Sequence, residues 1–393
     1  MDHATQVKIL KRLLAYVDAN GTAEAEAPWR NDVSVYASAD RLDAEMSVLF
    51  RKYPLLIGMS ADWSNPGDYR TDDFAGVPVL IVRGRDGVLR AFLNVCRHRG
   101  AKVATGQGKA SVFSCPYHAW TYDLEGRIRG IPEERAFPGV RAERPSLRPL
   151  PLCEKYGMVW VMPQPAADGA TTFDVDPWLG GLGPEFASYG FGSYHFWDRR
   201  TVDETMNWKI LVDTFHESYH IGFLHRDSLT AILHTNVADF EAFGPNHRLV
   251  FARKKLDRLK TQPEAEWDLM WNTATVYMLF PNTLFVTQGD HIEIHRVYPR
   301  DGRVDRAVME SSLYIPQPAA SDEERLHWQK NMDLVMKVVT TEDFPAGRSM
   351  QIGFASGAQT HVVYGRNEPA MIHYHQSLDR ALSPGGETRD AAE

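Results

Sequence analysis

The chain has 393 residues, and its 43 Lys and Arg against 51 Asp and Glu give a formal net charge of −8. Hydrophobic residues make up 44% and charged residues 24%, which is typical of a globular protein and excludes a disordered or collagen-like chain. At about 150 residues per domain, the length predicts two domains. The acidic balance leaves no surplus of basic side chains for phosphates, so it argues against nucleic acid as a partner.

The sequence also predicts the compartment. No apolar run approaches the roughly 20 residues that a membrane helix needs, and charges interrupt the first twenty residues, which lack a signal-peptide core. Three cysteines, Cys96, Cys115 and Cys153, are too few and odd in number for a disulfide framework. We therefore expect a soluble cytoplasmic protein with no membrane partner, whose thiols pack in the core or bind a metal.

The first part of the chain predicts two helices and then many short strands. Apolar residues recur at helical spacing over 5–19 and 39–53. Asp86 and Gly87 between two β-rich runs are a strong signal for a hairpin. The expected strands are 78–83, 88–95, 112–114, 120–123 and 156–162. Residues 45–165 are therefore predicted to form a small all-β domain.

The rest of the chain predicts a larger mixed domain. The Pro- and Ala-rich segment 163–170 is typical of a linker, and the second domain is expected to comprise 1–44 and 166–393. Helices are predicted over 202–220 and 325–339, and sheet strands over 276–288 and 289–298. His373 and His375 alternate on a further predicted strand, and the tail from Ser383 is expected to fray. The fold class is therefore α+β.

Four residues form the first candidate site. Cys96 and His98 are followed after sixteen residues by Cys115 and His118. Core packing explains such a pattern poorly, since thiolates and imidazoles in two short clusters suit a transition metal. Structural zinc accepts two Cys and two His, but usually with like ligands together. In a Rieske [2Fe–2S] cluster one iron takes two thiolates and the other two imidazoles, which mixed loops can supply.

The segments CRHRG (96–100) and CPYHAW (115–120), followed by YDLEG (122–126), resemble the Rieske motif of ring-hydroxylating oxygenase α subunits. The resemblance extends over most of the chain. It implies that Cys96, His98, Cys115 and His118 all ligate the cluster.

The segment 207–225 holds the second candidate site, and it fits two patterns. His216, Glu217 and His220 match His-Glu-x-x-His, the signature of zinc metalloproteases, in which the two histidines share a helix face. His220 and His225, with one carboxylate, instead suit a facial triad that leaves open positions on Fe(II).

The same segment resembles the mononuclear iron motif of the Rieske oxygenases. The resemblance implies that His220 and His225 bind iron together with a distant aspartate. Residues 337–343 resemble the region of that aspartate, which points to Asp343, with Glu342 beside it as the second choice. It also implies that Glu217 carries electrons between the two metal sites, although many relatives have Asp at this position.

Both sites in one chain imply the oxygenase component of a multicomponent system. A Rieske cluster delivers single electrons to a mononuclear Fe(II) that activates O2. The chain lacks the Gly-x-Gly-x-x-Gly pattern of dinucleotide binding, so electrons from NAD(P)H are expected through a separate reductase, with or without a ferredoxin. The resemblance further implies a homotrimer and a helix-grip catalytic domain built around an antiparallel sheet.

The substrate is expected to be an aromatic or cyclic small molecule that is hydroxylated, dihydroxylated or demethylated. The alternative is a quaternary or methylated amine, because Glu at the position of Glu217 occurs among amine-oxidising relatives. A different enzyme class, a zinc hydrolase, would use His216, Glu217 and His220. A cluster-bearing electron carrier is the third reading, but it has no need of the long segment after 170.

Overall fold

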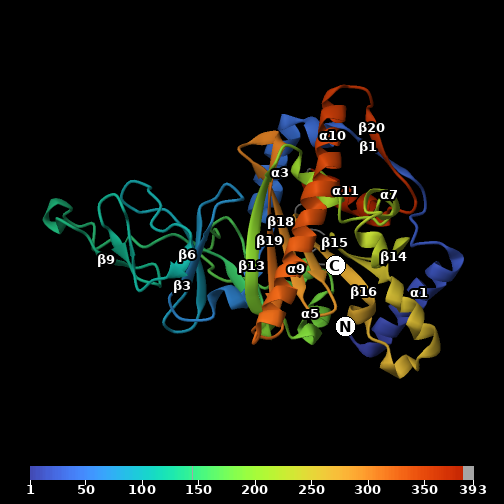
Figure 1. Cartoon of the computed structure of the whole chain (residues 1–393). Coiled ribbons are helices and arrows are strands. Elements are labelled where there is room, and N and C mark those ends of the chain that lie inside the picture. The colour runs from blue at the N-terminus through green and yellow to red at the C-terminus, as the bar shows by residue number, and fades with distance from the viewer. Residues whose placement is uncertain (144, 384–393) are drawn as a thin grey trace. The chain divides into compact units, whose positions relative to one another are not determined.

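The computed structural model describes residues 1–143 and 145–383. The chain divides into two compact units (Figure 1). One is Phe50–Val175, and the other joins Met1–Leu49 to the chain from Asp176 onward. The limits of 45–165 for the first functional domain, and of 1–44 with 166–393 for the second, stay predictions. No helix within these described ranges has both the length and the apolar character needed to cross a membrane.

The unit Phe50–Val175 is built from short antiparallel strands, as predicted. They form a five-stranded sheet in the order β10-β5-β4-β3-β6 and two three-stranded sheets, β11-β12-β2 and β7-β8-β9. The strands are β2 (Leu55–Met59), β3 (Asp68–Asp72), β4 (Val79–Arg83), β5 (Leu89–Leu93), β6 (Gln107–Lys109), β7 (Phe113–Ser114), β8 (Thr121–Tyr122), β9 (Ile128–Gly130), β10 (Pro149–Leu150), β11 (Leu152–Lys155) and β12 (Met158–Val161).

The hairpin predicted at Asp86 and Gly87 is confirmed between β4 and β5. Gly84 closes it twice, since its amide donates to the carbonyl of Val88 at 2.9 Å and its carbonyl accepts from Gly87 at 3.1 Å. Gly87 has φ of 79°, which glycine adopts without steric cost. The expected strand pairs at 112–114 with 120–123, and at 156–162, are likewise confirmed as β7, β8 and β12.

The other unit is organised around a seven-stranded sheet in the order β13-β19-β18-β17-β16-β15-β14, and every neighbouring pair is antiparallel. β16 and β17 are buried along their whole length, which explains why they are rich in Val, Thr and aromatic residues. The strands are β13 (His195–Glu204), β14 (Leu233–Phe243), β15 (Asn246–Arg253), β16 (Thr273–Leu279), β17 (Thr283–Thr287), β18 (Ile292–Arg300) and β19 (Arg303–Ile315).

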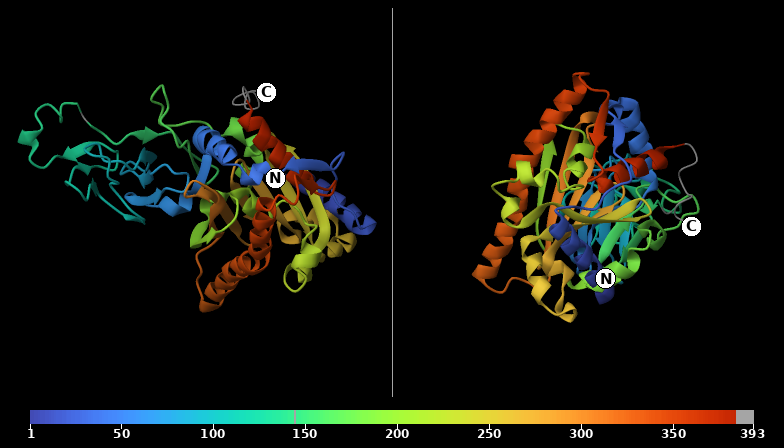
Figure 2. Two further views of the ribbon diagram at one scale, coloured as in Figure 1. Left: turned by 90° about the horizontal axis from the view of Figure 1, so that it is seen from above. Right: turned by 90° about the vertical axis from the view of Figure 1, so that its right-hand side faces the viewer.

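Helices cover this sheet (Figures 1 and 2). The predicted helices over 5–19, 39–53 and 325–339 are confirmed as α1 (His3–Ala19), α3 (Ala39–Lys52) and α9 (Asp322–Val338). The side chain of Asp2 caps α1 by accepting from the amide of Thr5 at 2.8 Å. The other helices used below are α6 (Trp208–Asp213), α7 (Ile221–Leu224), α10 (Phe344–Ala355) and α11 (Pro369–Leu382).

A π-helical turn, η7 (Val339–Asp343), joins α9 to α10 without a break in the chain direction. Pro345 follows it and has no N–H to donate to the turn before. The hydroxyls of Thr340 and Thr341 donate to the carbonyls four residues earlier, at 2.6 and 2.8 Å. Both features favour a widened turn over a regular α-helix, and such turns are frequent at functional sites.

Three predictions of secondary structure are wrong. Residues 202–220 are not one helix, because the chain up to Glu204 belongs to β13 and only Trp208–Asp213 is helical. The side chain of Asn207 starts this helix by accepting from Lys209 N at 3.0 Å, and the polar residues after Asp213 form turns instead.

The predicted strand 276–288 is two strands, β16 and β17, because Pro281 interrupts the run and cannot donate to a sheet ladder. His373 and His375 lie on α11 and not on a strand. Pro369 in the first turn of α11 favours the helix start there. The expected fraying beyond Ser383 falls on residues outside the described ranges.

Candidate metal centres and the catalytic pocket

Two loops with the same backbone pattern carry the Cys and His residues of the first site. The carbonyl of Cys96 accepts from Gly100 N at 3.0 Å, and the carbonyl of Cys115 accepts from Ala119 N at 2.9 Å. Each cysteine amide donates to the carbonyl five residues further on, at 2.8 and 2.9 Å. Gly100 and Ala119 both have positive φ, 82° and 55°. The two loops are therefore local copies of one turn, each following a strand.

The loops bury their thiols and leave their imidazoles near the surface. Cys96 and Cys115 are 3% and 4% exposed. Burial, and the nearby thiol of Cys115, raise the pKa of Cys96. The rings of His98 and His118 are partly exposed, with their centroids 4.6 Å apart. His98 stacks on Trp120, and its Nδ1 has no hydrogen-bond partner among the described residues. This donor set fits a Rieske cluster, with thiolates inside and imidazoles at the surface.

A tyrosine supports the first loop, and the sequence reasoning did not assign it a role. The hydroxyl of Tyr122 lies 3.4 Å from Sγ of Cys96 and accepts from the amide of Arg97 at 2.9 Å. Burial raises the pKa of Tyr122, so the phenol stays protonated and can donate a hydrogen bond to the sulfur of Cys96. Hydrogen bonds to the sulfurs are among the features that set the potential of such a cluster.

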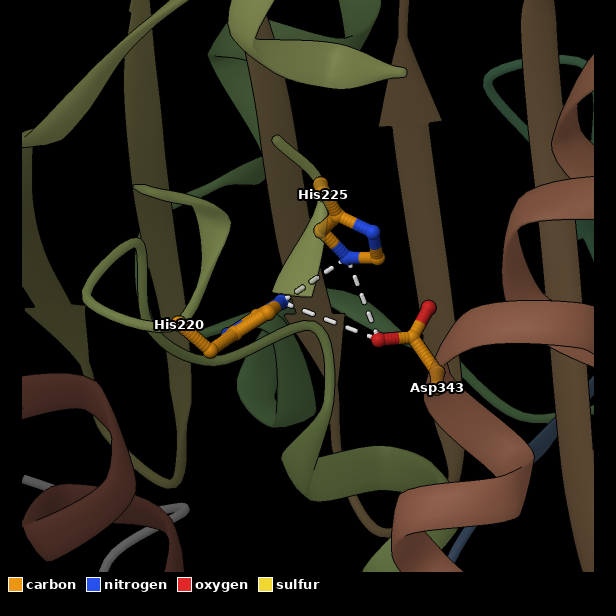
Figure 3. A group of neighbouring side chains, drawn as sticks. All are labelled: His220, His225 and Asp343. Atoms are coloured by element: carbon orange, nitrogen blue, oxygen red, sulfur yellow. Dashed lines mark hydrogen bonds and ion pairs between the residues drawn. The ribbon is translucent and has the colours of Figure 1, made fainter. Parts of the chain in front are cut away.

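The second site is formed by His220, His225 and Asp343, whose ligand atoms all lie within 4.8 Å of one another (Figure 3). Nε2 of His220 and Nε2 of His225 are 3.1 Å apart. Oδ1 of Asp343 lies 3.7 Å from Nε2 of His220 and 3.2 Å from Nε2 of His225. Oδ1 of Asp343 is buried and accepts no hydrogen bond in the described chain.

Each of the two histidines has one carboxylate bound to its Nδ1 atom. Glu217 accepts from Nδ1 of His220, and its other oxygen accepts from the backbone amide of His220 at 3.0 Å. Glu342 lies 2.7 Å from Nδ1 of His225 and also accepts from Ser228 Oγ at 2.7 Å. Because both Nδ1 atoms carry the proton, both Nε2 lone pairs face Asp343. Two imidazole nitrogens and a carboxylate that converge in this way are a donor set that suits a metal ion.

This geometry distinguishes Asp343 from Glu342, which the sequence alone could not do. Asp343 faces Nε2 of His225, whereas Glu342 contacts Nδ1 of the same ring. Asp343 is thus in a ligand position, and Glu342 is in the position that orients a ligand. The short helix α7 sets the histidines, since His220 precedes its first residue and His225 follows its last. The role of Ser228 was not expected, and only its nearness to His225 in sequence could have suggested it.

The arrangement required by the zinc hydrolase reading is not formed. Residues 214–220 are turns, so His216 and His220 do not share a helix face. His216 is fully buried, with its ring centroid 4.7 Å from that of His247 and 4.8 Å from that of Tyr374. Burial lowers the pKa of His216 to about 3. Glu217, the base in that reading, is already bound to His220.

The histidines of α11 serve other contacts. Nε2 of His375 lies 2.9 Å from Oδ1 of Asp213, and Nε2 of His373 lies 3.0 Å from the carbonyl of Gly244. Neither belongs to the group of converging ligand atoms in the described part of the chain.

A cavity of about 350 Å³ opens beside the second site, and His220, His225 and Asp343 line it. Most of its wall is apolar or aromatic, with Phe215, Phe251 and Trp271 among the lining residues. The remaining part is polar and charged. Its residues are Arg253, Gln288, Asp290, His291, Glu293, His327 and Asn331.

A chain of ion pairs runs through this polar wall. His291 contacts Asp290 at 2.7 Å and Glu293 at 3.1 Å. Burial alone lowers the pKa of His291, but its bonds with the two carboxylates outweigh burial and raise the pKa to about 9. Burial opposes the charged form of Asp290 as well, yet His291 and His327 lower its pKa to about 2. These charges therefore compensate one another.

Comparison with known proteins identifies both domains. Residues 54–148 match the family profile described as the Rieske [2Fe-2S] domain, and residues 191–384 match that of the ring hydroxylating alpha subunit (catalytic domain). The carnitine monooxygenase oxygenase subunit of Acinetobacter baumannii is 28% identical over 347 residues, which is 85% of this chain and 87% of that protein.

The carnitine monooxygenase oxygenase subunit of Escherichia coli K12 is 32% identical over 214 residues, which is 52% of this chain. That alignment spans only 54% of the length of the E. coli protein. Among solved structures, the quaternary ammonium Rieske monooxygenase CntA in complex with L-carnitine has the same fold. It superposes with a TM-score of 0.77 at 21% identity, over 91% of this chain and 97% of that one. The chain therefore belongs to the Rieske oxygenase family, as an α subunit that joins a Rieske [2Fe–2S] domain to a ring-hydroxylating catalytic domain.

Proposed function

We propose that this chain is the oxygenase component of a multicomponent Rieske system, which oxidises a small molecule with O2. What supports this most is that Nε2 of His220, Nε2 of His225 and Oδ1 of Asp343 all lie within 4.8 Å of one another, while each Nδ1 faces a different carboxylate. In this proposal these three residues hold a mononuclear Fe(II). A two-histidine, one-carboxylate set is the donor set of non-heme iron oxygenases.

In the same proposal Cys96, His98, Cys115 and His118 hold the [2Fe–2S] cluster. When bound, the cluster supplies single electrons and the mononuclear iron supplies the site at which O2 is activated. The buried thiols keep one side of the cluster from solvent, while the partly exposed imidazoles present the other side to an electron acceptor.

Glu217 is proposed as the bridge for electrons. One of its oxygens accepts a hydrogen bond from Nδ1 of His220, and the other accepts a hydrogen bond from the backbone amide of the same residue. This double contact fixes the tautomer of His220 and leaves Nε2 for the metal. In this proposal the carboxylate passes electrons from a cluster histidine to His220, which holds the iron.

Electrons are proposed to come from NAD(P)H through a separate reductase, with or without a ferredoxin. We further propose a homotrimer, in which the cluster of one chain serves the iron of the next. A cytoplasmic location also stays a prediction.

For the substrate, the comparisons favour the alternative over the first expectation. Two relatives that each align with 85% of this chain are carnitine monooxygenase oxygenase subunits, so we propose a quaternary or methylated amine. The rings of Phe215, Phe251 and Trp271 in the cavity wall suit such a group, because aromatic faces attract methylated ammonium ions. An aromatic or cyclic substrate is the second candidate, favoured by the apolar part of the same lining.

The test is oxygen incorporation by the holoenzyme. The protein would be loaded with both metal sites, reduced with a generic reductase, and supplied with ¹⁸O2. Carnitine and glycine betaine form one group of test compounds, and benzoate and naphthalene form the other. We expect labelled product from the amine group. Labelled product from the aromatic group alone would show that the substrate is aromatic and not an amine. If both metal sites are filled and an enlarged panel of both groups gives no labelled product, the oxygenase function is contradicted.

A further inference from the structure

Arg253 is the one charged residue in this polar wall that forms no ion pair among the described residues. It ends β15, and its side chain lines the cavity together with the candidate iron ligands. Its Nη2 donates to the side-chain oxygen of Gln288, a neutral group. Its Nε is buried and has no hydrogen-bond partner in the structure. Among the described residues, no carboxylate forms an ion pair with this guanidinium.

The two acids nearest to it are already engaged. Asp290 binds His291 at 2.7 Å and His327 at 2.8 Å. Glu293 binds His291 at 3.1 Å and His295 at 3.2 Å, one histidine on each oxygen. The oxygens of both carboxylates are therefore engaged by histidines, and neither carboxylate contacts Arg253, although both lie close enough to attract its charge.

A half-buried guanidinium that lacks an ion-pair partner is costly. Burial lowers the pKa of Arg253, which is the sign of a cation held away from water. An arginine does not lose its proton in a protein, so it cannot escape this cost by becoming neutral. A planar group with free N–H donors is best satisfied by a carboxylate, which can accept two parallel hydrogen bonds.

We propose that Arg253 binds a carboxylate of the substrate, so that the substrate is a small molecule with an acid group at one end and its reacting carbon toward His220 and His225. This inference rests on the proposed function, because it places the acid in the cavity beside the candidate iron site. Two kinds of compound carry the required group, a zwitterionic methylated amine and an aromatic acid. The acid is shared by both, and the other end distinguishes them.

The experiment measures binding directly, so it does not depend on turnover. Calorimetry of the anaerobic holoenzyme would compare two pairs that differ by the acid: glycine betaine against choline, and benzoate against benzyl alcohol. We expect one acid to bind about 10- to 100-fold more tightly than its alcohol, as the loss of a charged hydrogen-bonded contact predicts. The pair that shows the preference identifies the kind of substrate.

Three variants then assign the preference to Arg253. Arg253→Gln should remove it, while Arg253→Lys, which keeps the charge but loses the planar fork, should retain part of it. Arg258→Gln changes an exposed arginine of η5 (Lys254–Thr261), close in sequence but outside the cavity lining, and should leave the preference intact. Iron content, cluster absorbance and melting temperature would show that each variant is folded.

The outcomes separate the two proposals. A wild-type protein without preference in either pair, or an Arg253→Gln variant that keeps the preference, would overturn the role of Arg253. The oxygenase function would stand in that case if ¹⁸O is still incorporated into any substrate. A preference that Arg253→Gln abolishes supports the acid site even where no labelled product forms, and that second result would then count against the oxygenase function alone.

Discussion

The two metal centres of this chain are assembled in different ways. The cluster loops lie between residues 96 and 120, and each is closed by hydrogen bonds within its own backbone. The ligand atoms of the other centre come from α7 and from η7, which are more than a hundred residues apart in the chain. The first centre is a local structure repeated twice, whereas the second exists only when the catalytic unit is folded.

Their supporting contacts differ as well. At the first loop, the neutral phenol of Tyr122 contacts the thiol of Cys96 and accepts a hydrogen bond from the amide of Arg97. At the other centre, Glu217 and Glu342 each accept a hydrogen bond from Nδ1 of a histidine. The carboxylates make the imidazoles better donors and fix their tautomers. We therefore expect substitutions at the two centres to separate cleanly.

The largest effect is expected at the cysteines. Cys115→Ser should remove the visible colour and the acid-labile sulfide and abolish turnover, because a serine hydroxyl is a poor replacement for a thiolate ligand. Cys153→Ser is the matched control, since Cys153 is also a buried cysteine of the same unit. It should keep the absorption spectrum and the sulfide count. Loss of the cluster in Cys153→Ser, with retention in Cys115→Ser, would show that the wrong thiol has been assigned.

The next effect separates Asp343 from Glu342. Asp343→Ala should empty the mononuclear site and leave the cluster spectrum unchanged, because it removes a ligand of one centre only. Glu342→Ala should keep the site but weaken its affinity for iron by about 10- to 100-fold, as the loss of a group that orients a ligand does. Iron titration of both variants measures this. The reverse pattern would move the ligand by one residue.

Glu217→Gln should fill both centres and still lose activity. The amide keeps the size and an acceptor oxygen but removes the charge beside His220, so we expect turnover to fall by about 100-fold. Single-turnover reoxidation of the reduced cluster should slow by the same factor. Asp227→Asn, an exposed acid in the same segment, serves as the control. Normal reoxidation in Glu217→Gln would exclude this residue as the bridge.

The smallest effect compares the two loops directly. Gly100→Ala should destabilise the first loop by about 1–2 kcal/mol, because a Cβ at positive φ is strained. Here the strain is that of the backbone alone, since the added Cβ would meet only Val95, at 4.0 Å. Ala119→Gly should relieve the same strain in the second loop and raise stability by up to about 1 kcal/mol. Heating each variant and following cluster absorbance tests both signs, and a shift in the same direction for both would refute the equivalence of the loops.

The same contrast explains what the sequence could predict. The two Cys and His loops could be recognised in the sequence because each loop is short and the four candidate ligands follow a fixed spacing. The helices over 5–19 and 325–339 were readable from their apolar period, and both are present. Residues 202–220 were not, because the apolar run that suggested a long helix fills only Trp208–Asp213, between a strand and a set of turns.

Adjacent acids could not be told apart without the fold. Glu342 and Asp343 are neighbours in sequence, and which of them faces Nε2 of His225 depends on how η7 presents them. Nothing in the sequence marked Arg253 as a binding residue. Its proposed role depends on its place in the cavity wall and on its lack of an ion pair among the described residues, and both depend on the tertiary fold.

The most direct measurement is a metal count on anaerobically purified protein, taken together with its absorption spectrum. One Rieske cluster and one mononuclear site in each chain require about three irons and about two acid-labile sulfides, with broad visible bands. A colourless protein that contains zinc and no sulfide would contradict the assignment of both centres.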